Sequence, residues 1–203
     1  MGYHYSGLFQ HSLKNIIQVE KIIGQNIDNE SFDRQLLWLS IRRFISHAKA
    51  IFILCDKKQN LEALMLLRPI IELVVTLRWI VEDNTGKNRE QFMKSIEYKF
   101  NDDGIPVLGG YWTEKTLKTR MKDIGFDAKY YDSVIKKLHE ELHVNPSVIA
   151  RAHNKNLSAM SNKAIFSIGY QWLGHLLKVV NDLYPNQKEF MHCRDVWSKI
   201  RIK

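Results

Sequence analysis

The stretch from Leu61 to Val81 reads LEALMLLRPIIELVVTLRWIV and is the most apolar region of the 203-residue chain. Four charged residues and a proline interrupt it: Glu62, Arg68, Pro69, Glu72 and Arg78. A membrane-spanning helix would rarely carry these residues together. The stretch therefore predicts a helix buried in the core, kinked where Pro69 removes a backbone donor.

Two more helices are predicted before this stretch. Residues 7–27 show apolar residues at intervals of three and four, which is the mark of an amphipathic helix. Residues 32–58 carry a wide apolar stripe that predicts burial on more than one side, and Asn29 or Ser31 is suited to cap them. Asn60 is the expected cap of the central helix.

The chain after the central helix is also predicted to be helical. Residues 89–102 form a polar amphipathic pattern, and the glycines and proline of residues 102–110 then predict a loop. Thr113 or Thr116 is expected to open a short helix, and Asp127 to cap another. The remaining helices are expected over residues 128–143, 158–183 and 187–203.

These elements predict a single all-α domain over residues 1–203, because strand-like alternation does not persist outside the loops. The expected architecture is an antiparallel up-and-down helical bundle with a short helical insertion and a C-terminal helix. Its parts are the core bundle at 7–84 and 127–184, the insertion at 87–126 and the C-terminal helix at 187–203.

Composition restricts the possible partners and compartment. The formal net charge of +8 favours an anionic partner such as RNA, a nucleotide or an acidic protein, without choosing among them. Cys55 and Cys193 lie far apart, so neither a disulfide framework nor a four-thiolate zinc site is available. We expect a cytoplasmic protein, because the N-terminus has no secretory pattern and no segment has the character of a membrane span.

Arg68 and Glu72 are the first candidates for a functional role. They are four residues apart on one helix, so they share a face and can form a salt bridge. Charges on so apolar a helix are costly unless they are paired. The pair is therefore either a structural one beside Pro69 or part of a site.

The segment HEELHVNPS, residues 139–147, adds polar groups at a helix end. His139, Glu140 and His143 match HExxH, in which two histidines hold zinc and the glutamate activates water. Neither a third histidine at the expected spacing nor an apt downstream glutamate follows, so we expect no metal and no cofactor. Asn145 and Ser147 remain as candidate substrate-binding residues.

Two basic segments supply further candidates. Arg42 and His47 in RRFISH have the residue types of a ribonuclease, in which arginine holds phosphate while histidine moves protons. The alternative is a solvated arginine pair, Arg42 and Arg43, beside a partly buried histidine. Arg151 and His153 are candidate anion-binding residues in a loop, although an exposed basic loop explains them equally.

The motifs LLRPIIELVVTLRWI and HEELHVNPSV resemble those of bacterial families of unknown function that are grouped with the HEPN (higher eukaryotes and prokaryotes nucleotide-binding) superfamily. The resemblance covers about residues 61–153, with Arg68 and Glu72 matching the first motif and His143 the second. It implies a helical bundle, frequent homodimers and an association with toxin and antiphage-defence systems. Several members are metal-independent ribonucleases with an R-x4-6-H motif near the start of a late helix, whereas the R-x4-H here lies early.

The leading hypothesis is therefore a HEPN-like helical protein that binds or cleaves RNA. Arg68, Glu72 and His143 are the expected catalytic residues, with Arg42 and His47 as the second choice, and any activity would be that of a metal-independent endoribonuclease. The alternative is a non-catalytic binding or scaffolding protein, in which Arg68 and Glu72 are structural.

Overall fold

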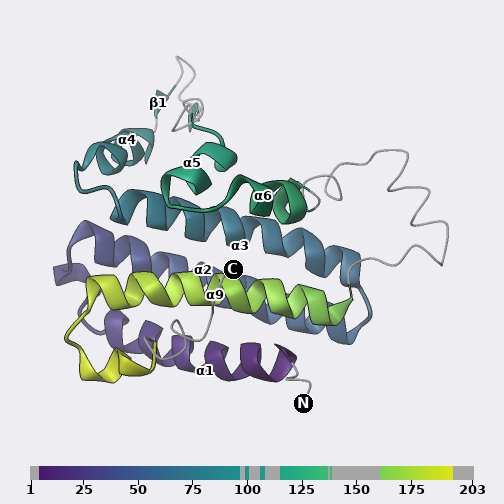
Figure 1. Ribbon diagram of the computed structural model, residues 1–203. Helices are drawn as coiled ribbons and strands as arrows, with labels where there is room; N and C mark the ends of the chain where they lie inside the picture. The colour runs from purple at the N-terminus through teal and green to yellow at the C-terminus, as the bar shows by residue number, and fades with distance from the viewer. Residues whose placement is uncertain are drawn as a thin grey trace.

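The computed structural model describes residues 5–96, 99–100, 106–107, 115–136, 138 and 161–193. Four long helices form its body: α1 (Tyr5–Gly24), α2 (Phe32–Asp56), α3 (Asn60–Val81) and α9 (Asn162–Leu183) (Figure 1). The shorter helical elements are η1 (Ile27–Asn29), α4 (Lys87–Ile96), α5 (Leu117–Asp123), α6 (Ala128–Tyr130), η2 (Tyr131–Ile135) and η3 (Lys188–Phe190). The predicted all-α class is confirmed, and none of the described helices has the length and apolar character of a membrane span.

The four long helices run in two directions. Helices α1, α2 and α3 alternate in direction, and α9 runs parallel to α1 and α3 (Figure 1). Near their starts α1 and α9 meet through Phe9 and Phe166, whose ring centroids are 6.4 Å apart. Towards their ends α3 and α9 meet through Arg78 and His175. The chain makes its return pass through α5, which packs on α3, and then through α6 and η2, with Tyr130 of α6 in contact with Trp172 of α9 (Figure 1).

The core of the bundle is apolar, and α1 comes very close to α9 within it. Phe9, Phe44 and Trp172 are among its largest fully buried side chains. Phe9 also packs against Phe52, with ring centroids 5.1 Å apart. Gly169 allows this packing, because a Cβ atom at that position would lie 2.9 Å from the Phe9 ring. The close approach therefore requires a residue without a side chain on α9.

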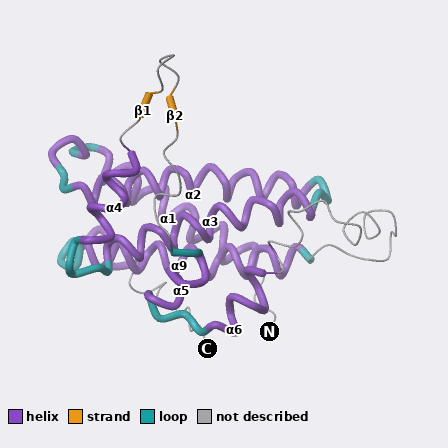
Figure 2. The backbone as a smooth tube through the Cα atoms, turned by 90° about the horizontal axis from the view of Figure 1, so that it is seen from above, coloured by secondary structure: helices purple, strands orange, loops and turns teal. Residues whose placement is uncertain are grey.

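The insertion contains a short β-ladder that the sequence did not predict. Helix α4 ends at Ile96, whereas the helix expected there extended to residue 102. Strands β1 (Lys99–Phe100) and β2 (Pro106–Val107) pair antiparallel, with Lys99 opposite Val107 (Figure 2). A proline is tolerated in such a ladder because a two-stranded sheet consists of edge strands. The ladder is too short to change the fold class.

Two of the predicted helix starts are confirmed by capping bonds. The Thr116 hydroxyl accepts from the backbone N–H of Thr119 at 3.2 Å, and the Asp127 carboxylate accepts from that of Lys129 at 2.9 Å. Asn60 does not cap α3, because it is already the first helical residue and Gln59 occupies the cap position. The predicted helices at 128–143 and 187–203 each extend beyond the described residues.

Candidate functional site

Arg68 and Glu72 form the ion pair that their spacing predicted. Arg68 Nε donates to Glu72 Oε1 at 2.9 Å on α3. The side chains are 22% and 40% exposed, so the pair lies at the surface of the bundle and not inside its core. This pairing uses one of the five N–H donors of Arg68 and leaves the Glu72 carboxylate accessible from outside.

Glu72 also lines a pocket of about 310 Å³ between α2, α3, α4 and α5. We call it the α2–α3 pocket. Its apolar lining is Leu36, Pro69, Leu73, Leu77 and Phe92, and its polar lining is Ser40, Arg43, Glu72, Thr76 and Arg120. The two arginines come from different helices, α2 and α5, and Glu72 is the carboxylate among the lining residues. The lining therefore has an excess of positive charge.

Arg120 is held in this pocket in a partly desolvated position. Its Nη1 donates to the Thr76 hydroxyl at 2.5 Å. Burial lowers the pKa of Arg120, and the attraction of Glu72 acts in the opposite direction without overcoming it. A cation whose charge is disfavoured by burial gains when an anion approaches. The planar guanidinium groups of Arg43 and Arg120 are suited to carboxylate or phosphate oxygens.

The structure separates Arg42 from the pocket and places Arg43 there instead. Arg42 turns towards α1, with its Nε 3.7 Å from Glu20 Oε1 and its guanidinium 4.7 Å above the Trp38 ring. His47 lies one turn after Arg43, and its Nδ1 donates to the Arg43 carbonyl oxygen at 3.1 Å. The arginine that shares a helical face with His47 is therefore Arg43, not Arg42.

The His47 imidazole is neutral near pH 7. Burial lowers its pKa below 6.5, and the positive charge of Arg43 lowers it further. Because the Arg43 carbonyl can only accept a hydrogen bond, the imidazole proton lies on Nδ1. The lone pair is then on Nε2, where it can accept a proton or a hydrogen bond.

The other candidates from the sequence lie outside the described residues. They are His139, Glu140, His143, Asn145, Ser147, Arg151 and His153. In the described part of the chain, no group of three or more His, Cys, Asp or Glu side chains is arranged to hold a metal ion. Of Arg68, Glu72 and His143, which match the motifs of the resemblance, the structure therefore describes Arg68 and Glu72.

A buried polar cluster that the sequence did not predict joins α3 to α9. Arg78 donates to both carboxylate oxygens of Glu82, at 2.7 and 3.0 Å. It also donates to the Ile124 carbonyl at 3.1 Å and to Nδ1 of His175 at 3.2 Å. Lys178 on α9 adds a bond to Glu82 at 2.9 Å. Burial acts to raise the pKa of Glu82, but the bonds from Arg78 and Lys178 lower it below its usual value.

Aromatic rings close this cluster from one side. Phe126 stacks on Trp172 with ring centroids 5.2 Å apart, and it lies 4.8 Å from the His175 ring. The Arg78 guanidinium is 5.4 Å from the centre of the Phe126 ring. Burial, together with the nearby cations Arg78 and Lys178, lowers the pKa of His175 to about 3. The cluster is therefore a neutral histidine and a charged arginine enclosed in the core.

The sequence indicates only some members of this cluster. Arg78 stands out as a charge on the apolar helix, and Glu82 follows four residues later, where an ion pair is expected. His175 belongs to an uncharged run, and it meets Arg78 across 97 residues of sequence. Such a contact depends on how α3 and α9 pack and not on local spacing.

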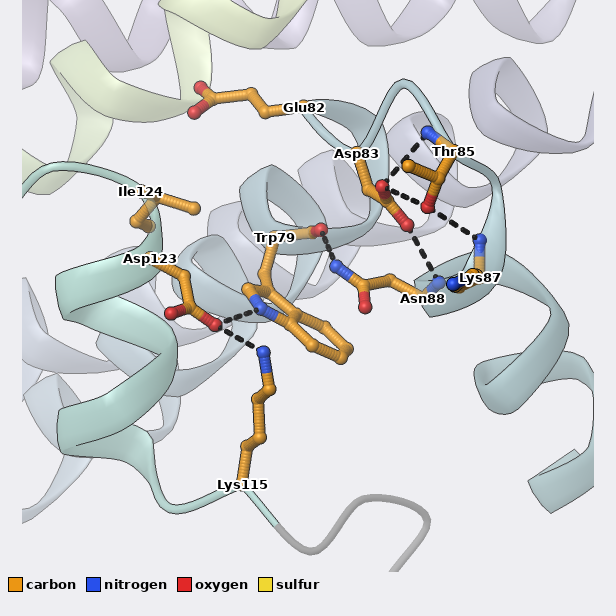
Figure 3. A pocket seen from close by; sticks show the side chains of 9 residues that line it. All are labelled: Trp79, Glu82, Asp83, Thr85, Lys87, Asn88, Lys115, Asp123 and Ile124. Carbon is orange, nitrogen blue, oxygen red and sulfur yellow. Dashed lines mark hydrogen bonds and ion pairs between the residues drawn. The ribbon is translucent and has the colours of Figure 1, made fainter.

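A second pocket, of about 370 Å³, lies beside the cluster at the end of α3 (Figure 3). Trp79 donates from its indole nitrogen to Asp123 at 2.9 Å, and Lys115 donates to the same carboxylate at 2.7 Å. On the other side the Asn88 amide donates to the Trp79 carbonyl at 2.8 Å. The side chains that line this pocket bond chiefly to one another. They attach α4 and α5 to α3, which is a structural role.

Comparison with known proteins adds one finding. Residues 36–100 match a family of unknown function (DUF5677). The matched region begins in α2 and contains α3 and α4, so it includes Arg43, His47, Arg68 and Glu72 but not Arg120. Neither the comparison with curated proteins nor that with solved structures gave a match. The family match therefore covers most of the α2–α3 pocket without assigning it an activity.

Proposed function

We propose that this chain is a HEPN-like helical protein that binds RNA through the α2–α3 pocket. The observation that carries the proposal is the convergence of Arg43 and Arg120, from two different helices, on one pocket with a single lining carboxylate, Glu72. The net charge of +8 supports it, because a basic protein attracts polyanions over longer distances.

The chemistry of the pocket fits a single-stranded RNA better than a simple anion. One guanidinium group can bind two phosphate oxygens at once, and aromatic side chains stack on unpaired bases. Phe92 is half-buried and lines the same pocket as the two arginines. The volume of about 310 Å³ lies in the range of small-ligand pockets, so a nucleotide unit rather than a duplex would enter.

The same proposal extends to metal-independent cleavage of the bound RNA, in keeping with the toxin and antiphage-defence systems that the resemblance implies. Arg43 would bind the scissile phosphate, and the neutral Nε2 of His47 would accept the proton of the ribose 2′-hydroxyl as its oxygen bonds to phosphorus. The P–O5′ bond would break, and the 5′-oxygen would leave with a proton from water, which gives a 2′,3′-cyclic phosphate and a 5′-hydroxyl. His143, which the resemblance favours as the proton carrier, is the competing assignment. Arg68 would then hold the Glu72 carboxylate in position at the edge of the pocket.

The non-catalytic alternative has its own supporting observation. Arg68 and Glu72 bond to each other at 2.9 Å on the bundle surface, as two structural residues would. In that case the chain is a non-catalytic binding or scaffolding protein.

Binding is tested with a fluorescein-labelled single-stranded RNA and four proteins: wild type, Arg43→Ala, Arg120→Ala and Arg42→Ala. Arg42→Ala is the matched control, because it removes the same charge one residue away from a side chain that does not line the pocket. Loss of a charge-assisted bond should weaken binding about tenfold in the Arg43 and Arg120 variants. An equal loss in the Arg42 variant would show binding by diffuse charge and would contradict the pocket.

Cleavage is tested on total RNA in EDTA with wild type, His47→Ala and His143→Ala, each checked for native circular dichroism. Loss of activity in one histidine variant assigns the proton carrier and supports a ribonuclease. Absence of cleavage by wild-type protein that binds RNA would overturn the catalytic part and leave an RNA-binding protein.

A further inference from the structure

The outward side of α2 is basic and free of carboxylates. Between Arg34 and Cys55 the helix sequence contains no Asp or Glu. Arg42, Arg43 and Lys49 are all exposed there, Arg42 with 58% of its side-chain surface. Glu20 of α1 approaches Arg42 at 3.7 Å and compensates part of one charge. This side of the helix therefore keeps a positive field.

The same side carries two large exposed aliphatic residues. Leu39 is 55% exposed and Ile53 is 57% exposed. They are two heptads apart, so they lie in one line along the helix, about 21 Å from each other. Ser46 is exposed midway between them. We call this strip, with the flanking Arg42, Arg43 and Lys49, the α2 outer face.

The α2 outer face is not suited to a second copy of this chain. A two-fold symmetric contact places the same patch of both subunits against each other. Arg42, Arg43 and Lys49 would then meet the same three cations, and Glu20 would offset only part of the charge of Arg42. Like charges in such a contact repel, and an interface of this kind is disfavoured.

The aliphatic residues also distinguish a protein partner from a nucleic acid. Phosphate groups would be attracted by the arginines and by Lys49, but Leu39 and Ile53 would gain nothing from a phosphate backbone. A helix with aliphatic residues two heptads apart would cover both positions and remove them from water. Acidic residues on either side of its apolar line would meet the basic flanks of α2.

We propose that the α2 outer face docks an acidic amphipathic helix of a partner protein. Leu39 and Ile53 are the apolar anchors, and the positive charges of Arg42, Arg43 and Lys49 favour a partner helix with acidic side chains. Because Arg43 also lines the α2–α3 pocket, a docked helix would reduce access to that pocket. The inference stands on the exposed residues of α2 and does not depend on RNA binding.

The test uses a designed helical peptide with two leucines fourteen positions apart and glutamates flanking that line. A control peptide has the same composition with the two leucines on opposite faces. Binding is measured by fluorescence anisotropy, without RNA, to wild type, Leu39→Ser, Ile53→Ser and Met93→Ser. Met93 is the matched control, because it is also an exposed aliphatic residue, 46% exposed, but on α4.

The expected result is that wild type and Met93→Ser bind the designed peptide equally. The Leu39 and Ile53 variants should bind it at least tenfold more weakly, and so should wild type with the control peptide. These substitutions lie at the surface, and unchanged thermal unfolding would show that the fold is intact.

Three results would overturn the proposal. Equal binding of both peptides would mean attraction by charge alone, and absence of binding to wild type would mean that the face takes no such helix. A wild-type dimer that Leu39→Ser dissociates would mean that a second copy covers the face. Because RNA is absent from this experiment, its outcome is separate from that of the RNA-binding test.

Discussion

Arg78 on α3 donates from Nη1 to Nδ1 of His175 on α9 across 3.2 Å, and the two residues are 5% and 4% exposed. The histidine accepts this bond in its neutral form, because the pKa of His175 is lowered to about 3. Glu82 balances the charge of Arg78 through two further bonds. The contact ties together two helices that run in the same direction and have no short connection.

The stability of the fold should therefore depend on pH through His175. The unfolded chain takes up a proton on this residue near pH 6.5, whereas the folded chain does so only near pH 3. Between these values the unfolded state binds more protons, so the free energy of unfolding falls as the pH is lowered. The slope from this one group is at most about 1.4 kcal/mol per pH unit, and it vanishes above pH 6.5.

The measurement is urea unfolding at several pH values between 4.5 and 7.5, for wild type and for His175→Gln. Glutamine does not titrate, so the variant should lose the part of the slope that belongs to His175. Other groups, such as His47, titrate in both proteins and cancel in the comparison. Parallel profiles for the two proteins would show that His175 has no lowered pKa in the folded state.

Arg78 should contribute far more to stability than Arg68. Each arginine bonds to a glutamate four residues later on α3, but the Arg78 side chain is 7% exposed and that of Arg68 is 22% exposed, beside a Glu72 that is 40% exposed. Removing one member of a buried pair costs about 3 kcal/mol, because the remaining polar groups stay in the core. Removing one member of a surface pair costs about 1 kcal/mol or less.

The two variants Arg78→Met and Arg68→Met form a matched set, since both remove the same charge and keep a similar length. Urea unfolding at pH 7.5 gives the difference in the free energy of unfolding. Equal losses in both variants would mean that the cluster around Arg78 does not behave as buried.

These two arginines also show how far the sequence could predict the site. Arg68 and Glu72 have the same spacing as Arg78 and Glu82, and both form ion pairs. The prediction from the sequence was made for Arg68 and Glu72 and is confirmed. Which pair is buried depends on where the return segment and α9 cover α3. Helical spacing does not show which part of α3 is covered by other elements. The prediction from the sequence therefore selected Arg68 and Glu72, which the structure shows to be the exposed pair.

The same limit explains the other differences. Caps and apolar spacing are local, and they located the long helices of the bundle and limited the start of α5 to Thr113 or Thr116, of which Thr116 makes the capping bond. The helices that α9 packs against, α1 and α3, are set by contacts across the fold, and the residues of α9 alone do not predict them. Arg42 and Arg43 are adjacent, and only their packing shows that Arg42 meets Trp38 while Arg43 lines the pocket.

Gly169→Ala should destabilise the bundle although alanine is the better helix former. The added Cβ would lie 2.9 Å from the ring of Phe9, which is fully buried. A ring packed on all sides cannot move freely, so overpacking should cost about 1–3 kcal/mol. Gly7→Ala is the control, because nothing lies within 4 Å of its Cβ position in α1. That change should leave the thermal midpoint unchanged or raise it, and a similar rise for Gly169→Ala would refute the close contact.

Arg43 should also determine part of the salt dependence of RNA binding. Each phosphate that a protein neutralises on a single strand contributes about −0.7 to the slope of log K against log salt concentration, because condensed counterions are released. Arg43→Ala should therefore flatten the slope by about 0.7, and so should Arg120→Ala, since both line the α2–α3 pocket. Arg42→Ala removes an equal charge that is directed towards Glu20, so its slope should match wild type. Titrations of one labelled RNA at four salt concentrations give the three slopes, and a flattening with Arg42→Ala as large as with Arg43→Ala would place the phosphate contacts outside the pocket.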